Sequence, residues 1–486
     1  MTRRRRLAAF STTPALLAVL VVVLLVSGCA RVVRGSAVSV FADPFRVAGM
    51  PAVDGPSGLR PDADAPTRTV RATDGGPIDQ LAASAVSDVE DYWDTAYLDT
   101  FGERFTPVRG LVSWDAAELF EVFCSMDTHG LENAAFCFPE RTIGWDRGQM
   151  LPRLRRANGD MAVVMVLAHE YGHWVSRQAG LTSRRSPILV AEQQADCFAG
   201  TYLRWVAEGN SRRFTLSTAD GLNDVLAAVV AVRDPVLTEG DWRAGLNEHG
   251  SAFERLSAFQ FGFTNGPSAC AAIDMPEIKQ RRGELPVLLP ENQTGELPVT
   301  ERSVRTLLDA LTIVFRPAAP PRLTLAAAEA ESCPDARPSP PASYCPATNV
   351  IAVDLDGLAA LGAQSDTTDG LASGDNTAYS VLASRFVLAL QREHGGVALN
   401  DAKAALRTAC LTGVATTKLS AGVVTSDGTS ISLTAGDLDE AVSGMLTNGL
   451  VASDVHGETV PSGFSRIDAY RLGVLGDASR CYQRFG

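Results

Sequence analysis

The chain lacks a basic patch. It contains 43 lysine and arginine residues against 56 aspartate and glutamate residues among 486, which gives a formal charge of −13. Four of the arginines stand together at residues 3–6, so the rest of the chain is more acidic still. Because nucleic acids bind through their phosphates and need a positive surface, the composition argues against nucleic acid as a partner.

The chain also lacks an apolar run of the roughly 18 residues that a membrane-spanning helix needs. A shorter run, "PALLAVLVVVLLVSGC" at residues 14–29, follows the basic "MTRRRR". This order is typical of a signal peptide, and "VSGC" resembles a bacterial lipobox. We expect cleavage after residue 28, a lipid on Cys29, and a protein anchored to the outer face of the bacterial cytoplasmic membrane. The alternative is an uncleaved signal anchor, which would also place the body outside the cytoplasm.

Hydrophobic periodicity is absent from residues 30–77, which are rich in proline, glycine, aspartate and alanine. We expect this stretch to be a flexible tether. The remaining chain is longer than one typical hydrophobic core supports, which predicts more than one domain.

The cysteines indicate an internal repeat. Apart from Cys29 there are eight, an even number that fits an oxidising compartment. They form two sets of four, with steps of 13, 60 and 73 residues in the first set and 12, 65 and 71 in the second. "FCFPERTIGWD" (136–146) also aligns without gaps to "YCPATNVIAVD" (344–354). We therefore predict two copies of one fold, at 78–280 and 298–486, with a proline-containing linker at 281–297.

The first copy contains "VLAHEYGHWV" at residues 166–175, within a segment that reads as a helix from Asp160, its predicted cap, to Gly180. His169 and His173 are four residues apart, so their rings project from one helix face. Both can reach one zinc ion at about 2.0–2.1 Å. Glu170, one step round the helix, can take a proton from zinc-bound water and pass it to a departing amine.

A candidate third ligand lies downstream. "SPILVAEQQADCFAGTYLRWVAEG" reads as a helix with Ser186 as its cap and Pro187 at its first position. Glu192 and Asp196 share a face of that helix. Glu192 can complete a site of two histidines and one carboxylate, and Asp196 can accept a hydrogen bond from a ligand histidine. Small residues at 195, 199 and 200 would let the two helices approach closely.

"HEYGH", "EQQADCFAG" and an "HG" with an arginine six residues after the histidine together resemble the bacterial family of putative neutral zinc metallopeptidases, which look like gluzincins. The resemblance covers residues 78–280 and implies one zinc ion per chain, held by His169, His173 and Glu192, with Glu170 as base and Asp196 behind a histidine. Gln193 departs from the leucine expected there. The resemblance further implies an α+β, mainly helical, zincin-like fold with a small sheet ahead of the motif helix.

Other polar residues have weaker signals. His249 could stabilise an oxyanion as a donor, but the second copy keeps the equivalent His456, which favours a structural role for "HG". Arg255 and Arg466 are predicted to tie a loop to a helix end, and Tyr171 to pack in the core. His129 and His394 are expected on the surface.

We expect Cys197, although it lies beside the site, to bond with Cys270 rather than bind metal. The other predicted disulfide of the first copy is Cys124–Cys137. By the repeat, the predicted disulfides of the second copy are Cys333–Cys345 and Cys410–Cys481.

The second copy has lost the metal-site residues. Aligned through the cysteines, the five positions of His169, Glu170, His173, Glu192 and Asp196 hold Ser384, Arg385, Leu388, Ala405 and Ala409. We predict a metal-free, non-catalytic repeat that recognises substrate, covers the cleft, binds a partner or stabilises the first copy.

Three functional hypotheses follow. The leading one is a membrane-tethered zinc metallopeptidase that acts on peptide or protein substrates in the cell envelope. The second is an envelope binding protein with a structural zinc, although a structural site has no use for Glu170. The third is a zinc hydrolase of non-peptide bonds, which would share the whole site and differ only in its cleft.

Overall fold

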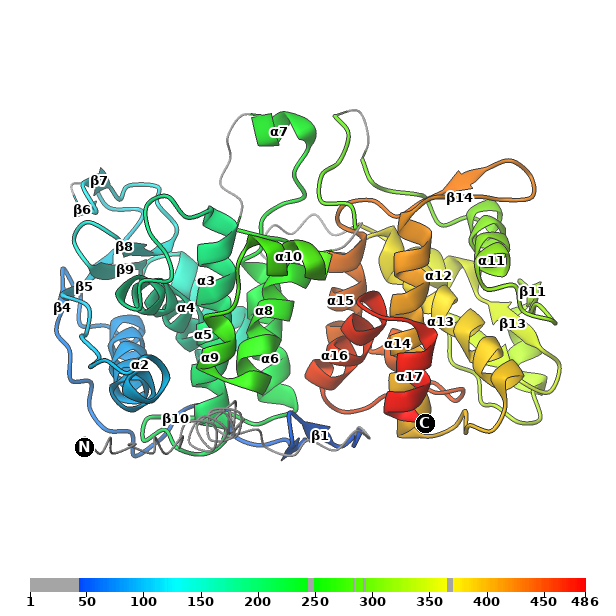
Figure 1. Cartoon of the computed structure of the whole chain (residues 1–486), viewed down its shortest axis with the longest axis horizontal. Helices are drawn as coiled ribbons and strands as arrows, with labels where there is room; N and C mark the ends of the chain where they lie inside the picture. The colour runs from blue at the N-terminus through cyan, green and yellow to red at the C-terminus, as the bar shows by residue number, and fades with distance from the viewer. Residues whose placement is uncertain (1–42, 120, 244–248, 283–284, 292–293, 365–369) are drawn as a thin grey trace, which may run out of the picture. The chain divides into compact units, whose positions relative to one another are not determined.

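Figure 1 shows the computed structural model of the chain, which describes residues 43–119, 121–243, 249–282, 285–291, 294–364 and 370–486. The predicted signal peptide, the predicted lipidation site Cys29 and residues 30–42 of the predicted tether lie outside these ranges. Within the described ranges, no helix combines the length and the apolar character needed to cross a membrane.

The prediction of a flexible tether is wrong for residues 43–77, which hold four short strands: β1 (Arg46–Val47), β2 (Met50–Pro51), β3 (Gly58–Leu59) and β4 (Val70–Arg71). β1 and β2 form a hairpin, β3 pairs with β10 (Phe214–Thr215), and β4 joins the main sheet of the first half. Each strand has only two residues, which is too short to produce the alternation that marks a strand in a sequence.

The main sheet has four strands in the order β4-β5-β9-β8. β5 (Gly110–Trp114) and β9 (Thr142–Asp146) run parallel to each other and to β4, whereas β8 (Ala134–Cys137) runs antiparallel to β9 and forms one edge. A separate hairpin pairs β6 (Val122–Phe123) with β7 (Met126–Asp127). The predicted small sheet ahead of the motif helix is therefore confirmed, and its edge strand β8 packs beside that helix.

Helices form most of the rest of this half (Figure 1), namely α2 (Pro77–Phe101), α3 (Met150–Asn158), α4 (Asp160–Gln178), α5 (Ile188–Ala207), α6 (Asp220–Ala231), α7 (Glu239–Arg243), α8 (Ala252–Asn265), α9 (Pro267–Cys270) and α10 (Met275–Arg282). The motif "HEYGH" lies on α4, and the predicted third ligand lies on α5. The small elements of sheet among many helices confirm the predicted α+β, mainly helical class.

Two helix caps differ from the prediction by one residue. Asp160 is the first residue of α4, and its cap is Gly159, whose φ of 76° favours glycine. Pro187 is the cap of α5, while the Ser186 hydroxyl accepts a hydrogen bond from the Ser183 amide in the preceding turn. In both helices the residue next to the predicted cap has the non-helical backbone conformation that a cap requires.

Glycines allow α5 to pack closely against its neighbours. A Cβ atom on Gly172 of α4 would lie 2.7 Å from the Ala195 Cα atom, so the predicted close approach at residue 195 is present. Gly200 instead faces α8, where a Cβ atom would lie 2.2 Å from the Phe259 carbonyl oxygen. On the α8 side, a Cβ atom on Gly262 would lie 1.8 Å from the Cys197 carbonyl oxygen.

The second half contains α11 (Glu301–Phe315), β11 (Arg322–Thr324), η1 (Ala327–Ser332), β12 (Ala342–Cys345), β13 (Val350–Val353), α12 (Leu355–Leu361), α13 (Asp375–His394), α14 (Ala402–Ser420), β14 (Val423–Val424), β15 (Ser430–Ile431), α15 (Asp437–Thr447), η2 (Leu450–Ala452), α16 (Gly463–Val474) and α17 (Ala478–Phe485). Its three-stranded sheet has the order β11-β13-β12, with β11 parallel and β12 antiparallel to β13. β5, β9 and β8 of the first half have the same order and directions.

The structure contains all four disulfides that the sequence predicts, namely Cys124–Cys137, Cys197–Cys270, Cys333–Cys345 and Cys410–Cys481. The long-range bond of each half joins corresponding elements: α5 to α9 in the first half and α14 to α17 in the second. One buried apolar cluster includes residues of both halves, and α15 and α16 pack against α6 and α8.

Candidate metal centre

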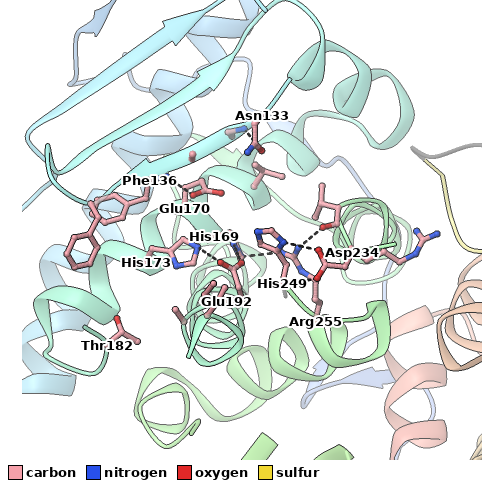
Figure 2. A pocket seen from close by; sticks show the side chains of 18 of the residues that line it. Asn133, Phe136, His169, Glu170, His173, Thr182, Glu192, Asp234, His249 and Arg255 are labelled. Atoms are coloured by element: carbon pink, nitrogen blue, oxygen red, sulfur yellow. Dashed lines mark hydrogen bonds and ion pairs between the residues drawn. The ribbon is translucent and has the colours of Figure 1, made fainter. Parts of the chain in front are cut away.

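Two neighbouring helices bring the motif residues together. α4 carries His169, Glu170 and His173, and α5 carries Glu192 and Asp196. Figure 2 shows the two imidazole rings and the Glu192 carboxylate turned toward one another. The side chains of His169 and Glu192 are largely buried, and that of His173 retains 18% of its exposure. The cluster is therefore reached from one side.

Each histidine lies close to one oxygen of the Glu192 carboxylate. The His169 Nε2 atom lies 3.3 Å from one Glu192 oxygen, and the His173 Nε2 atom lies 3.5 Å from the other. Two atoms each bound at about 2.0–2.1 Å to one tetrahedral ion are separated by roughly 3.3–3.4 Å. The three side chains thus fit a zinc ion in their chemistry, and each histidine–Glu192 distance is close to that separation. Glu170 lies close to both histidines as well.

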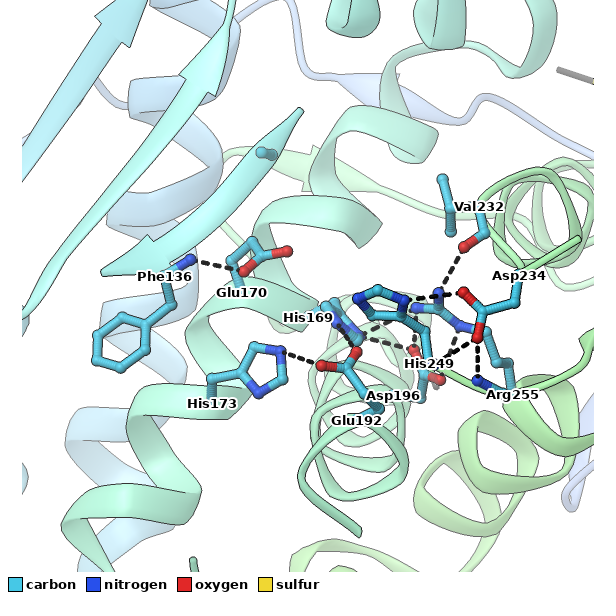
Figure 3. Close-up of polar contacts among 12 residues, drawn as sticks. Phe136, His169, Glu170, His173, Glu192, Asp196, Val232, Asp234, His249 and Arg255 are labelled. Atoms are coloured by element: carbon cyan, nitrogen blue, oxygen red, sulfur yellow. Dashed lines mark hydrogen bonds and ion pairs between the residues drawn. The ribbon is translucent and has the colours of Figure 1, made fainter. Parts of the chain in front are cut away.

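Asp196 lies behind His169. One of its oxygens is 2.7 Å from the His169 Nδ1 atom (Figure 3). A carboxylate at Nδ1 holds the proton on that nitrogen and leaves the Nε2 lone pair directed at the donor cluster. The position of Asp196 therefore agrees with the role that the sequence analysis expects for it.

Arg255 is a residue of this site that sequence reasoning missed. Its guanidinium donates to both Asp196 oxygens, at 3.0 and 2.9 Å, and a third bond of 2.6 Å reaches the Val232 carbonyl at the end of α6. The predicted tie to a helix end is present, but the larger contact is the buried pair with Asp196. A signal was available, since a buried carboxylate such as Asp196 needs a cationic partner, and Arg255 belongs to the "HG" segment.

Glu170 is held at the edge of the sheet. Its Oε2 atom accepts a hydrogen bond of 2.8 Å from the Phe136 amide on β8. Burial raises the pKa of Glu170 to about 7, against the opposing effect of a charged His169. A carboxyl group with a pKa near neutrality can both accept and release a proton at physiological pH.

The electrostatics of the ligand candidates are set by burial and by their neighbours. Burial lowers the pKa of His173 to about 4, so this ring is neutral at pH 7. Burial also opposes the charged form of His169, but the Asp196 carboxylate outweighs it and raises the His169 pKa to about 10. The two histidines hold the pKa of Glu192 below its usual range in spite of burial. Protein groups alone produce these shifts, and a cation at the Nε2 atoms would replace the proton.

The cluster opens into a cavity of about 580 Å³. Strand β8 and Phe138 line one part of it, and Arg184, Arg233 and His249 line others. In the view of Figure 3, Phe136 and Glu170 lie on one side of the two histidines, and His249 with Asp234 lies on the other. The cavity is therefore bordered by a strand edge, by acids and bases, and by cationic side chains.

His249 lies just before α8 and faces this cavity with 44% of its side chain exposed. Its Nδ1 atom is 2.8 Å from an Asp234 oxygen, and this hydrogen bond raises the pKa of His249. The structure thus places a polar ring near the donor cluster. Its role as an oxyanion donor remains a prediction.

The other candidates lie away from the cavity. Tyr171 is fully buried, donates to a Glu90 oxygen at 2.9 Å and accepts from the Val108 amide at 3.2 Å, so its predicted packing role is confirmed. His129 and His394 are exposed, as expected. Cys197 is bonded to Cys270 and is not available to a metal.

The corresponding place in the second half holds a buried arginine. Arg385, which aligns with Glu170, is fully buried and donates to the Ser453 hydroxyl at 2.9 Å and to the Leu450 carbonyl at 3.1 Å. His456 accepts a hydrogen bond of 3.1 Å from the Arg337 amide. Arg466 donates to backbone carbonyls. Both retained residues therefore have structural contacts in this half.

Comparison with known proteins finds a family match for the first half. Residues 57–273 match the family described as "Putative neutral zinc metallopeptidase". The match starts beside β3, which agrees with the finding that the described part of the predicted tether belongs to the folded body.

Curated relatives match part of the chain. "Uncharacterized protein Rv2575" of Mycobacterium tuberculosis is 32% identical over 164 residues, covering 29% of this chain and 56% of the relative. "Uncharacterized protein YpfJ" of Escherichia coli K12 is 30% identical over 131 residues, covering 24% of this chain and 44% of the relative. The chain thus spans about half the length of the curated relatives it matches. No solved structure gives a significant match.

Proposed function

We propose that this chain is a zinc metallopeptidase that hydrolyses peptide bonds in the cell envelope. The observation that carries the proposal is the convergence of His169, His173 and Glu192 beside Glu170, in a cavity bordered by a strand edge. The family match over residues 57–273 supports the same reaction class.

The chain's own residues supply the acid–base chemistry. A zinc ion held by the three ligand candidates would polarise a peptide carbonyl and make a water molecule more acidic. Glu170 accepts the proton of the attacking water and then delivers it to the amine that leaves. The Phe136 amide bond fixes the Glu170 carboxylate in place, and His249 donates to the oxygen that becomes negative.

The edge strand favours a peptide as substrate. β8 pairs with β9 on one side only and lines the cavity on the other. The free backbone groups of an edge strand can bind an extended peptide by hydrogen bonds, and on β8 the Phe136 amide is already bonded to Glu170. A peptide added there would lie across the donor cluster, with its scissile carbonyl near Glu170.

We propose further that the protein is a lipoprotein anchored by Cys29 to the outer face of the cytoplasmic membrane. The basic and apolar N-terminal pattern supports this location. Four disulfides support it independently, since such bonds persist in oxidising compartments.

We propose that the second half is a degenerate copy of the first. The two halves share the order of their elements, the positions of their disulfides and the positions of two glycines, which supports this origin. Gly413 and Gly473 reproduce the close approach of Gly200 and Gly262, because Cβ atoms there would lie 2.2 Å from the Tyr470 carbonyl oxygen and 1.8 Å from that of Cys410. The copy keeps the framework and not the donor set, so it is non-catalytic.

Zinc content and casein cleavage test the proposed function, measured on the full chain in detergent as wild type, Glu170→Gln and Glu192→Ala. We expect one zinc per wild-type chain with cleavage. Glu170→Gln should retain zinc and lose cleavage by at least about 10²-fold, whereas Glu192→Ala should lose both. Absence of zinc from the wild type would overturn the ligand assignment. Zinc without cleavage of casein or of a peptide library would instead favour a binding protein.

A further inference from the structure

The helix that carries Arg255 begins at a carboxylate from the second half. The first two amides of α8, at Ala252 and Phe253, each donate a hydrogen bond of 3.0 Å to Asp439 on α15. Asp439 is buried, with 4% of its surface exposed. The first amides of a helix have no partner within the helix and need an external acceptor. Asp439 supplies it from 186 residues away.

Local capping leaves these two amides to Asp439. Ser251 is the cap of α8, and its hydroxyl accepts from the Glu254 amide at 3.3 Å, while the Glu254 carboxylate accepts from the Ser251 amide at 3.2 Å. This reciprocal capping box serves the amides of residues 251 and 254. The amides between them bind the second half, so the direction of the first turn of α8 depends on both halves.

A chain of buried contacts leads from that turn to the donor cluster. Arg255 lies three residues after Ala252, within one helical turn. Its guanidinium binds both Asp196 oxygens, and Asp196 in turn holds the Nδ1 atom of His169. A shift of the first turn of α8 would move Arg255, and with it the carboxylate that orients His169.

The second half makes an equivalent contact, but it does not lead to a candidate metal centre. The first amide of α16, at Gly463, donates a hydrogen bond of 2.7 Å to Asn223 on α6. Arg466 again lies three residues further on, but its guanidinium meets the carbonyls of Met445 and Val460, at 2.8 and 2.6 Å. Asn223 thus makes the same kind of contact across the same interface, but it lies at the opposite end of α6 from the Val232 carbonyl that Arg255 binds.

We propose that Asp439 is a positioning residue for the metal centre, through which the second half holds α8, Arg255 and Asp196 in the arrangement that orients His169. The second half would then help to hold the metal ligands of the first half in place. This inference rests on the proposed function, because it requires His169 to be a zinc ligand.

The test uses the full chain and compares Asp439→Ala and Asp439→Asn with the matched control Asn223→Ala. The main measurement is the zinc dissociation constant by competition with a chelator, together with kcat and KM at saturating zinc. Asp439→Ala should weaken zinc binding about tenfold, the low end of the range for outer-shell residues, and lower kcat more than it raises KM. Asp439→Asn keeps one acceptor oxygen and should be intermediate. Asn223→Ala should stay within about twofold of wild type.

Urea unfolding of the same variants separates positioning from stability. Both alanine variants remove an interface contact, and we expect a comparable loss of unfolding free energy from each. If Asp439→Ala and Asn223→Ala bind zinc equally well, the positioning role is wrong and the zinc function stands. If wild type binds no zinc, both proposals fall. Should Asp439→Ala not fold, the isosteric Asp439→Asn decides by the same criterion.

Discussion

The two halves place opposite electrostatic arrangements in corresponding helices. In the first half, buried histidines and carboxylates converge on one point, and Arg255 balances the carboxylate behind them. In the second half, Arg385 is buried with donors directed at a hydroxyl and at backbone carbonyls. Burial lowers the pKa of Arg385 to about 10. The first half thus pairs its buried arginine with a carboxylate, whereas the second half surrounds Arg385 with neutral acceptors and leaves its Nε atom without a hydrogen-bond partner among the described residues.

The pair of arginines sharpens the comparison. Arg255 and Arg466 lie at equivalent positions of α8 and α16, and each binds the carbonyl of a neighbouring helix. Arg255 alone has a carboxylate partner, because Ala409 stands where Asp196 would be. The same residue type therefore contacts the candidate metal centre in one half and makes only helix contacts in the other, and the difference lies in its partner.

Removal of the Asp196 carboxylate should have the largest effect. Asp196→Ala leaves Arg255 buried without its ion-pair partner, which costs about 3–5 kcal/mol of unfolding free energy. It also frees the His169 ring and should weaken zinc binding by about 10–100-fold. Chemical denaturation and zinc titration of the full chain check both effects. Unchanged stability would mean that backbone carbonyls satisfy Arg255 as they satisfy Arg466.

Removal of either long-range disulfide should lower the unfolding free energy by a similar amount, but only one removal should weaken zinc binding. They close loops of 73 and 71 residues, so loss of either through a double alanine variant should cost about 4 kcal/mol. Cys197 lies on α5 next to Asp196, whereas Cys410 lies on a helix without ligands. We expect weaker zinc binding only for Cys197→Ala/Cys270→Ala. Denaturation curves and zinc titration test this, and an equal loss of zinc binding in both variants would contradict it.

The smallest expected effect concerns the pH dependence of the second half. Glu440 lies near Glu296, Asp375 and Asp437, and burial together with these carboxylates raises the pKa of Glu440 to about 9. An acid whose folded pKa exceeds its unfolded pKa binds more protons in the folded state. Its contribution to stability is therefore present below the unfolded pKa of 4.5 and is lost as pH rises toward 9.

Glu440→Gln should remove the loss of stability that wild type shows as pH rises. The variant should be more stable than wild type at pH 9 by at least about 1 kcal/mol and should show a flatter dependence of the melting temperature on pH between 5 and 9. Thermal unfolding across this range provides the measurement. Zinc binding at the first half should not change, which serves as the internal control. A wild-type protein whose stability rises steadily over that interval would contradict the assignment.

Local patterns predicted much of the centre. The four-residue spacing of His169 and His173, the acidic pair Glu192 and Asp196, and the even number of cysteines each depend on neighbouring residues or on simple counting. The helix periodicity of 3.6 residues places such side chains on one face whatever the rest of the chain does. The predicted disulfides followed from the similarly regular cysteine spacing, and the small sheet ahead of α4 from the family resemblance.

The described part of the supposed tether shows where such reasoning stops. Strand β4 is only two residues long, and its partner β5 lies about forty residues further along the chain. A strand of that length has no periodicity of its own, and the strand preference of a residue depends strongly on its tertiary context. Composition rich in proline and glycine therefore describes residues 43–77 as irregular, which is correct for most of them, but does not show that they are bound to the body.

The sequence by itself determined the ligand candidates, the candidate general base and the cysteine pairs, because each is encoded within a helix turn or in a regular spacing, and the family resemblance implied the mainly helical class. Only the tertiary structure decided the role of Arg255, the contact of Gly200 with α8, the pairing of the N-terminal strands and the bond from Asp439 to α8. Arg255 meets Asp196 across 59 residues, and Asp439 meets Phe253 across 186. Contacts at such separations depend on the path of the whole chain, and no local period records them.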